Sequence, residues 1–489
     1  MKKPNILFFF TDQQRFDTIA ALGNAVIKTP ALDRICKAGV AFTSTYSPSP
    51  VCVPARCSMT YGQYPMHTKC YDNGADMPKD RPSFMQVLTD AGYRTHGIGK
   101  CHFMPDKHAL RGFQSREVQK EVPARSSDDY TSFLEEEGWG DLPEPHGVRG
   151  EMYYVPQVSQ LPQHLHPTQW VGDRSVAFIE SQEDVEEPWF LLSSYIHPHP
   201  PFAPPSPWHK LYRSFDMPLP MVPQDLESLQ TFANQRQNRY KGRDQGIDNN
   251  LMRNIKAHYY ACISFIDYQV GRVLDALEAT GQLDNTLILL TSDHGEHLGD
   301  YECFGKRSMH DSCARIPMLA ALPGRFEGGE RCEKLANLVD VMPTILSAAG
   351  CDTSALTMDG IDLHDLLQGV SDRGAVYSQI GEKGEAIYTA VTERWKYAYS
   401  APDQQEYLFD RMVDPLETRN RAGLPTTGDI LKTLREQTIT FFVEGGETYA
   451  AEGNQWKVYP KKDLPSDPDS GYMTQDRPGY VLDLPGYTD

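Results

Sequence analysis

Residues 4–14 read PNILFFFTDQQ, and this stretch carries the clearest information about the fold. An unbroken apolar run from Ile6 to Phe10 that stops at polar residues is typical of a strand buried on both faces of a sheet. Further apolar runs stand at 189–196, 286–292 and 316–322, and helical spacings of apolar residues stand at 83–91 and 254–280. Strands that alternate with helices predict an α/β fold, with a large central mixed sheet sandwiched by helices.

The pattern changes after about residue 375. Short alternating segments at 386–392, 395–400 and 406–409 precede a helical run at 430–443. They predict a smaller antiparallel sheet with one helix. From residue 450 onward, prolines and glycines interrupt any regular pattern. We therefore predict a large α/β domain over 1–375, a C-terminal α+β subdomain over 376–449 and an extended tail over 450–489. The aromatic residues of the tail predict packing on a neighbouring subunit or on its own chain.

Composition excludes several classes of function. The 489 residues include 47 Lys and Arg against 66 Asp and Glu, and the net charge of −19 disfavours binding to nucleic acid or to acidic membranes. The N-terminal apolar run is too short for a secretory signal or a membrane helix, which predicts a soluble, cytoplasmic protein. Ten cysteines without a C-x-x-C pair favour reduced thiols over a disulfide scaffold or a zinc ribbon.

Two pairs of polar residues directly follow predicted strands and are candidate metal ligands. Asp12-Gln13 ends the first strand, and Asp293-His294 follows another strand within TSDHGEHLGD, residues 291–300. Ligands of open α/β sheets bind beyond the carboxyl ends of strands, so the pairs are expected at one cleft. Two carboxylates, an amide oxygen and an imidazole suit a hard or borderline divalent cation. A turn cap is the competing interpretation of Asp12.

The segment CVPAR, residues 52–56, contains a candidate nucleophile. A lone cysteine near an arginine is usually a small buried residue, which is the competing interpretation. Cys57 lies close by, so this segment alone leaves open which thiol would react.

CVPAR matches the C-x-P-x-R signature of the formylglycine-dependent sulfatases, which are members of the alkaline-phosphatase-like superfamily, and the chain resembles them. Other segments resemble the same family in the same order: GYRTHGIGKCHF (92–103), HPHPPF (197–202), TSDHGEHLGD (291–300) and Gly305-Lys306. The resemblance implies that 1–375 is the catalytic domain. It also implies that Cys52, and not Cys57, is oxidised to formylglycine by a formylglycine-generating or an anaerobic maturation enzyme.

The resemblance further implies one divalent metal, held by Asp12, Gln13, Asp293 and His294. Calcium is the family's usual ion. Gln13 and His294 replace one Asp and the Asn of the commonest ligand set, so manganese is the alternative.

The resemblance also implies roles for the remaining polar residues. Lys100 and Lys306 would neutralise the sulfate together with the metal. His102 is the candidate base that lets the sulfated intermediate collapse. His199 is the candidate acid for the leaving group, and a neighbouring anion is expected to raise its pKa. Arg56 would hold residue 52 and a metal-ligand carboxylate in place.

The function that the resemblance implies is hydrolysis of a sulfate monoester, in a small molecule or a carbohydrate. A phosphonate monoester or phosphodiester hydrolase is the first alternative, because such relatives share the arrangement. A non-catalytic anion- or glycan-binding protein with unoxidised Cys52 is the second. Sulfated sugars, choline-type sulfates and aryl sulfates all remain open as substrates. No nucleic-acid or membrane partner is expected, and a homo-oligomer is an open possibility.

Overall fold

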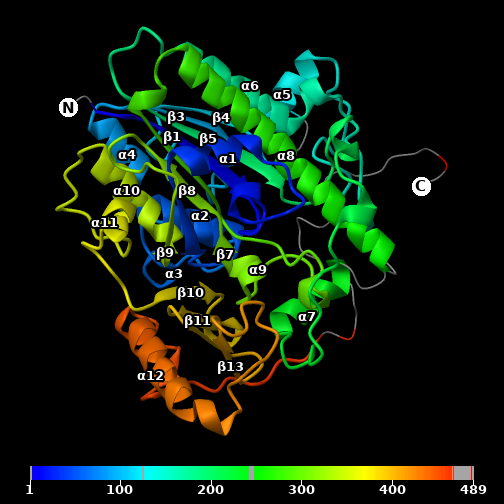
Figure 1. The fold of residues 1–489 in the computed structure, drawn as a ribbon, viewed down its shortest axis with the longest axis vertical. Coiled ribbons are helices and arrows are strands. Elements are labelled where there is room, and N and C mark those ends of the chain that lie inside the picture. Colours follow the sequence, from blue (N-terminus) through cyan, green and yellow to red (C-terminus); the bar gives the residue numbers. More distant parts are fainter. Residues whose placement is uncertain (1–2, 124–125, 242–246, 465, 467–485, 487–489) are drawn as a thin grey trace.

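The structure is a computed structural model that describes residues 3–123, 126–241, 247–464, 466 and 486 (Figure 1). A nine-stranded mixed sheet forms its centre, in the order β4-β3-β5-β1-β6-β8-β2-β7, with β9 also paired to β2. The strands are β1 (Asn5–Asp12), β2 (Val40–Tyr46), β3 (Arg94–Gly99), β4 (Ser115–Val118), β5 (Trp189–Pro198), β6 (Thr286–Ser292), β7 (Arg315–Ile316), β8 (Met318–Ala321) and β9 (Glu330–Asn337). The predicted α/β fold class is confirmed.

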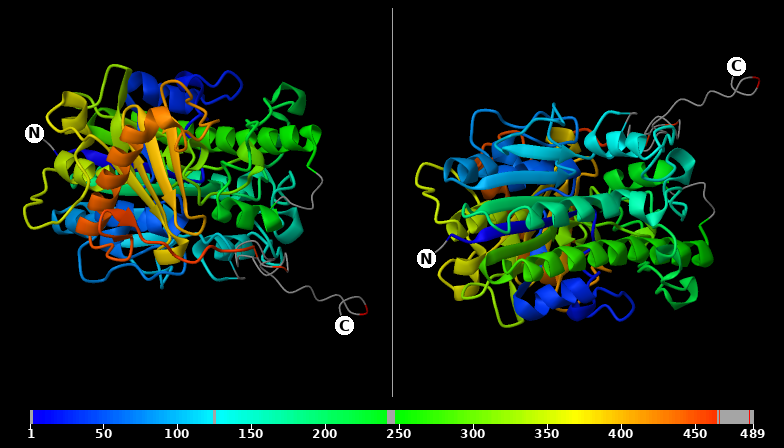
Figure 2. Two further views of the ribbon diagram at one scale, coloured as in Figure 1. Left: turned by 90° about the horizontal axis from the view of Figure 1, so that it is seen from below. Right: turned by 90° about the horizontal axis from the view of Figure 1, so that it is seen from above.

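Helices cover both faces of this sheet (Figure 2). Along β1, Ile6, Phe8 and Phe10 pack in the core under α2, α4, α10 and α11, whereas Leu7 and Phe9 pack under α1, α6 and α8. Side chains of a strand alternate between its two faces, so a fully apolar β1 belongs between two layers of helices. The helices of this domain are α1 (Pro30–Ala38), α2 (Cys52–Tyr61), α3 (Pro65–Thr68), α4 (Phe84–Asp90), α5 (Asp129–Glu136), α6 (Pro167–Glu180), α7 (Phe232–Lys241), α8 (Asn249–Ala279), α9 (Asp311–Ala314), α10 (Val341–Ala348) and α11 (Leu363–Gln368).

One predicted strand differs from the structure. The run at 316–322 is not a single strand but is divided between β7 and β8 at Pro317. Proline has no backbone N–H for the ladder, and the pairing changes there: among the described strands β7 pairs with β2 alone, whereas β8 pairs with β6 as well as with β2.

A second, four-stranded antiparallel sheet lies at one end of the molecule with α12 packed on it (Figure 1). Its elements are β10 (Val376–Ile380), β11 (Ile387–Val391), β12 (Trp395–Ser400), β13 (Gln405–Asp410) and α12 (Gly428–Glu444), followed by a small hairpin of β14 (Ala451–Glu452) and β15 (Gln455–Trp456). Lys396, fully buried on β12, ties this sheet to the large domain through an ion pair with Asp311, and it also pairs with Glu417 of its own subdomain. The domain boundaries at 375 and 449 stay predictions.

The start of the tail packs on the second sheet. Trp456 stacks on the rings of Tyr388 and Tyr399, at centroid distances of 5.0 and 4.8 Å. Most of the predicted tail, including the aromatic residues beyond 466, lies outside the described residues. Among the residues that the structure describes, no helix is both long enough and apolar enough to cross a membrane.

Candidate active site

Four adjacent parallel strands place the site. The order β3-β5-β1-β6 brings their carboxyl ends to one edge of the sheet. The polar residues that end or closely follow these strands are Lys100 and His102 after β3, His199 after β5, Asp12 and Gln13 at the end of β1, and Asp293 and His294 after β6. Residues far apart in the sequence therefore meet at the edge where such sheets bind ligands.

Cys52 is the first residue of α2 and is fully buried. Its Sγ lies 2.8 Å from Lys306 Nζ, 3.3 Å from His294 Nε2 and 3.9 Å from Asp12 Oδ1. Burial, reinforced by Asp12, raises the pKa of the Cys52 thiol to about 11, although Lys306 and Lys100 oppose the shift. The unmodified thiol is therefore protonated at neutral pH and is a weak nucleophile.

Asp12, Cys52, Asp293 and His294 form a buried cluster with one potential ligand atom each, all within 4.8 Å of one another. Burial raises the pKa of Asp293 to about 7, and the neighbouring Asp12 carboxylate adds to the rise. Burial also opposes ionisation of Asp12, but Lys100, His199 and Arg56 together hold its pKa well below the usual value. Two buried carboxylates that repel each other, with an imidazole beside them, are a donor set that fits a divalent cation.

Gln13 adjoins this cluster, because its backbone N–H donates to Asp293 Oδ1 at 3.0 Å. Its Oε1 accepts a hydrogen bond from Lys306 Nζ at 3.0 Å, and its Nε2 donates to the buried carboxylate of Glu296. Glu296 also accepts from Tyr154 Oη at 2.8 Å. The amide oxygen is thereby turned toward the lysine that contacts Cys52.

Arg56 bridges the two carboxylates of the cluster. Its Nε donates to Asp293 Oδ2 and its Nη2 to Asp12 Oδ2, both at 2.9 Å, while Nη1 donates to the Lys100 carbonyl at 2.6 Å. The side chain is buried over the ring of Phe10. A planar guanidinium with three such contacts fixes the separation and the orientation of both carboxylates.

Two ammonium groups make the pocket attractive to an anion. Lys100 Nζ lies 2.6 Å from Asp12 Oδ2 and 2.5 Å from Glu121 Oε2, and Lys306 Nζ lies beside Cys52. Burial disfavours their charge, but the carboxylates of Asp12 and Glu121 raise the pKa of Lys100 and that of Lys306. Both lysines are therefore cationic at neutral pH.

The two candidate acid–base histidines occupy different surroundings. His199 Nε2 lies 3.3 Å from Glu121 Oε1, and its Nδ1 contacts the Pro200 carbonyl at 2.8 Å. Burial lowers the pKa of His199 well below its usual value even though Glu121 opposes the shift, so the rise expected from the sequence is not found. His102 has a left-handed backbone (φ 56°) and a buried Nδ1 without a hydrogen-bond partner among the described residues. Burial and Lys100 lower its pKa as well, so the ring is neutral.

Glu121 is the residue of this site that the sequence did not identify. It lies beyond β4, is buried, and contacts Lys100 and His199. Burial opposes its ionisation, but His199, Lys100 and Arg149 hold its pKa well below the usual value. The only signal in the sequence is a glutamate shortly after a short strand at the edge of the sheet, which specifies no function.

Comparison with known proteins gives a consistent result over most of the chain. The model of the sulfatase family matches residues 4–351, and the model described as N-sulphoglucosamine sulphohydrolase, C-terminal, matches residues 299–442. The chain is 28% identical over 488 residues to an arylsulfatase of Clostridium perfringens, covering 94% of this chain and 99% of that protein. It is 32% identical over 443 residues to a choline-sulfatase of Rhizobium meliloti, covering 86% and 83%.

Solved structures show the same fold. A phosphonate monoester hydrolase from Silicibacter pomeroyi superposes with a TM-score of 0.79 at 24% identity, covering 94% of this chain and 100% of that one. At this identity the likeness concerns the fold alone.

Proposed function

This chain belongs to the sulfatase family, whose members hydrolyse sulfuric ester bonds, and we propose that it cleaves a sulfate monoester with Cys52 as the precursor of its nucleophile. The observation that carries this assignment is the position of Cys52, buried at the start of α2 against Lys306 and beside the Asp12–Asp293 pair. With a pKa of about 11, the thiol itself would attack poorly. Conversion to formylglycine removes this difficulty.

The metal is proposed to bind to Asp12, Gln13, Asp293 and His294, with calcium as the first candidate and manganese as the second. When bound, the ion would supply positive charge that offsets the negative charge of the sulfate and of the nucleophile. Arg56 holds both carboxylates for this purpose, because it donates to each of them and is itself buried.

The side chains around residue 52 account for binding and proton transfer. Lys100 and Lys306 neutralise the sulfate, whose negative charge otherwise repels a nucleophile. The hydrated aldehyde offers two hydroxyls on one carbon, one for attack on sulfur and one for release of sulfate by C–O cleavage. His102 is neutral and has an open Nδ1 that accepts the proton of the second hydroxyl. His199 is the proposed proton donor to the leaving oxygen. Burial keeps its ring neutral in the empty site, so this role requires that it take up a proton with the anionic substrate, and Glu121 Oε1, 3.3 Å from Nε2, stabilises that charged form.

Two measurements test the assignment together. We expect mass spectrometry of the peptide that contains Cys52 to show an aldehyde in place of the thiol after expression with a maturation enzyme. We also expect a higher kcat/KM on an aryl sulfate than on the matched aryl phosphonate or phosphodiester. The reverse preference would favour the phosphonate or phosphodiester hydrolase. An intact thiol together with an absence of turnover would favour the non-catalytic binding protein.

Replacing His199 with alanine is expected to depend on the leaving group. Alkyl or sugar alcohols need a proton as they leave, so their kcat should fall by roughly 10²- to 10⁴-fold. Activated phenols leave as anions and should lose less than about tenfold. A series of sulfate esters of graded leaving-group pKa checks this, and equal losses across the series would reject the acid role.

The remaining expectations stay proposals. They are the maturation enzyme as a transient partner, a homo-oligomeric assembly and a cytoplasmic location. The names of the relatives include an arylsulfatase, a choline-sulfatase and an N-acetylglucosamine-6-O-sulfatase, so a small organic sulfate and a sulfated carbohydrate are both compatible with the family.

A further inference from the structure

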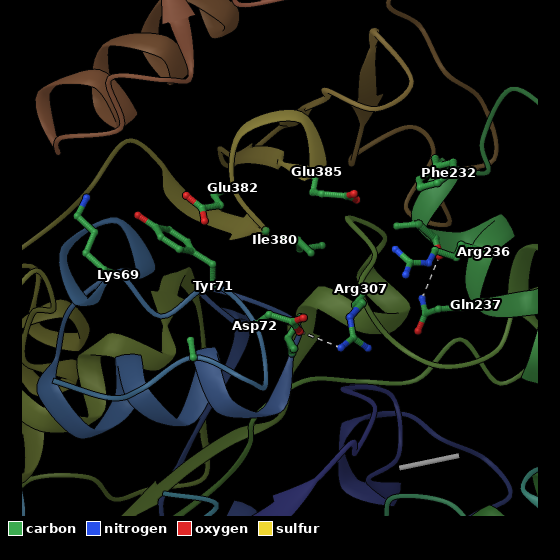
Figure 3. A pocket seen from close by; sticks show the side chains of 14 residues that line it. Lys69, Tyr71, Asp72, Phe232, Arg236, Gln237, Arg307, Ile380, Glu382 and Glu385 are labelled. Atoms are coloured by element: carbon green, nitrogen blue, oxygen red, sulfur yellow. Dashed lines mark hydrogen bonds and ion pairs between the residues drawn. The ribbon is translucent and has the colours of Figure 1, made fainter. Parts of the chain in front are cut away.

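A pocket of about 500 Å³ lies next to the catalytic cluster, between the large domain and the second sheet (Figure 3). Its lining includes Val51, the residue before Cys52, and Arg307, the residue after Lys306. Gln237 also lines it and donates a hydrogen bond to the Lys306 carbonyl. The walls of the pocket therefore adjoin Cys52 and Lys306 along the backbone and through the hydrogen bond of Gln237.

The opposite wall comes from the C-terminal part of the chain. Ile380 at the end of β10 and the residues after it, Glu382 and Glu385, complete the pocket across from Arg307 (Figure 3). Phe232 and Ile380 are almost fully buried and supply an apolar surface. A pocket with an apolar floor and charged groups around its rim suits a small polar organic group such as a substituted ring.

Most charges of the rim are already paired. Lys69 pairs with Glu447 at 3.4 Å, Glu382 with Lys383 at 3.2 Å, and Glu385 with Lys462. The two glutamates are thus partly compensated, which weakens any attraction of this wall for a cationic ligand.

Arg236 and Arg307 lie on one side of the pocket, with Asp72 beside Arg307 (Figure 3). Arg307 Nη2 lies 3.0 Å from Asp72 Oδ1. Burial opposes ionisation of Asp72, but Arg307 lowers its pKa, and Arg236 contributes to the same shift. Within the described part of the chain, Arg236 forms no ion pair, although it is exposed on α7 beside this pair. Asp72 compensates Arg307, whereas Arg236 has no such partner among the described residues, so this side of the pocket keeps a net positive charge.

We propose that this pocket holds the organic part of the substrate, and that Arg236 with Arg307 binds a second anionic group on it, a carboxylate or a further sulfate. The inference rests on the proposed function, because it assigns the substrate class of the same site. A guanidinium is suited to either anion, since its N–H groups match two oxygens at once. The preferred substrate is therefore a sulfate ester with a second negative charge, rather than a choline-type sulfate with a positive one.

The position of Arg307 supports this assignment. Its backbone is left-handed (φ 62°), and its N–H donates to the Pro50 carbonyl at 3.1 Å. Lys306 and Arg307 are therefore held to the segment that precedes Cys52. One ester sulfate at Lys306 and a second anion at Arg307 would thus be bound by consecutive residues of one fixed loop.

The test compares three sulfate esters of one sugar ring: one otherwise uncharged, one with a carboxylate and one with a second sulfate. The measured quantity is the ratio of kcat/KM for each doubly charged ester to that for the uncharged one. Arg236→Gln should lower this ratio by about tenfold. Arg239→Gln removes the same charge from α7 outside the pocket and should leave the ratio as it is in the wild type. The two charged esters distinguish a carboxylate from a sulfate as the second anion.

Binding gives a second readout that does not depend on turnover. In a Cys52→Ala background, calorimetry should show the doubly charged ester binding about tenfold more weakly after Arg236→Gln. An unchanged ratio and an unchanged Kd in Arg236→Gln would overturn the inference, as would a wild-type preference for choline sulfate over both charged esters. If Arg236→Gln turns over the esters with an unchanged ratio of kcat/KM, only this inference is wrong. If the wild-type enzyme binds the sulfate esters but hydrolyses none of them, the result counts against the proposed function.

Discussion

Replacing Cys52 with alanine is expected to abolish turnover, with a fall in kcat of at least about 10⁴-fold. Alanine carries no side chain that could be converted to the nucleophile. Sγ of Cys52 is the atom that contacts both Lys306 and His294. The measurement is initial-rate kinetics on an activated aryl sulfate, with the metal content of each preparation determined in parallel.

Cys57 provides the matched control. It is buried on the same helix, but it lies in the hydrophobic core under the sheet, where it interacts with Cys70 rather than with the catalytic cluster. Cys57→Ala should retain most of the activity and should lose only a little stability. If Cys57→Ala were inactive and Cys52→Ala active, the assignment of the nucleophile would be wrong.

The fold was predictable where an apolar or periodic pattern in the sequence corresponds to one type of secondary structure. The apolar run of β1 is typical of a strand between two layers, and the run at 286–292 coincides with β6 for the same reason. The division at Pro317 shows the limit of this reasoning. Side-chain hydropathy continues across the proline, whereas the hydrogen-bond ladder does not, and the ladder determines which strand is the neighbour.

The site was predictable where its residues directly follow strands or carry a family signature. Asp12 and Asp293 met these conditions, and the structure places them together around Arg56. Glu121 does not directly follow a strand and belongs to no signature. Its proximity to His199 depends on how β4 pairs with β3 at the edge of the sheet, which the sequence does not reveal. The low pKa of His199 was missed for a related reason: burial is a property of the packed pocket and leaves no local mark in the sequence.

Replacing Asp293 with asparagine is expected to lower both metal content and kcat/KM, the latter by at least about 100-fold. Asparagine keeps the shape but removes the charge that Arg56 Nε and the cation both need. Asp275→Asn makes the same change at an exposed position on α8 and should have no effect on either quantity. Full activity after exhaustive chelation would contradict the metal site itself.

The same carboxylate predicts how stability depends on pH once the metal is removed. The folded-state pKa of Asp293 is raised to about 7 from a usual 3.8, because burial and the Asp12 carboxylate disfavour its charge. Between these two values the folded protein binds more protons at this position than the unfolded chain does. Its contribution to stability is therefore complete below about pH 4 and is lost as the pH rises through 7. The pKa of Asp12 is lowered, so this carboxylate stays ionised across the same pH range and adds no pH dependence there.

Bound metal compensates the two negative charges, so the stabilisation that it gives should grow as the pH rises from 5 to 8. Thermal melts of the chelated and the metal-loaded enzyme across this range measure the effect. In Asp293→Asn the residue no longer titrates, so the melting temperature of the chelated variant should depend less on pH than that of the chelated wild type. If both chelated proteins lost stability in parallel between pH 4 and 7, the charge at position 293 would not be its source. The metal would then owe its affinity to geometry rather than to the relief of carboxylate repulsion.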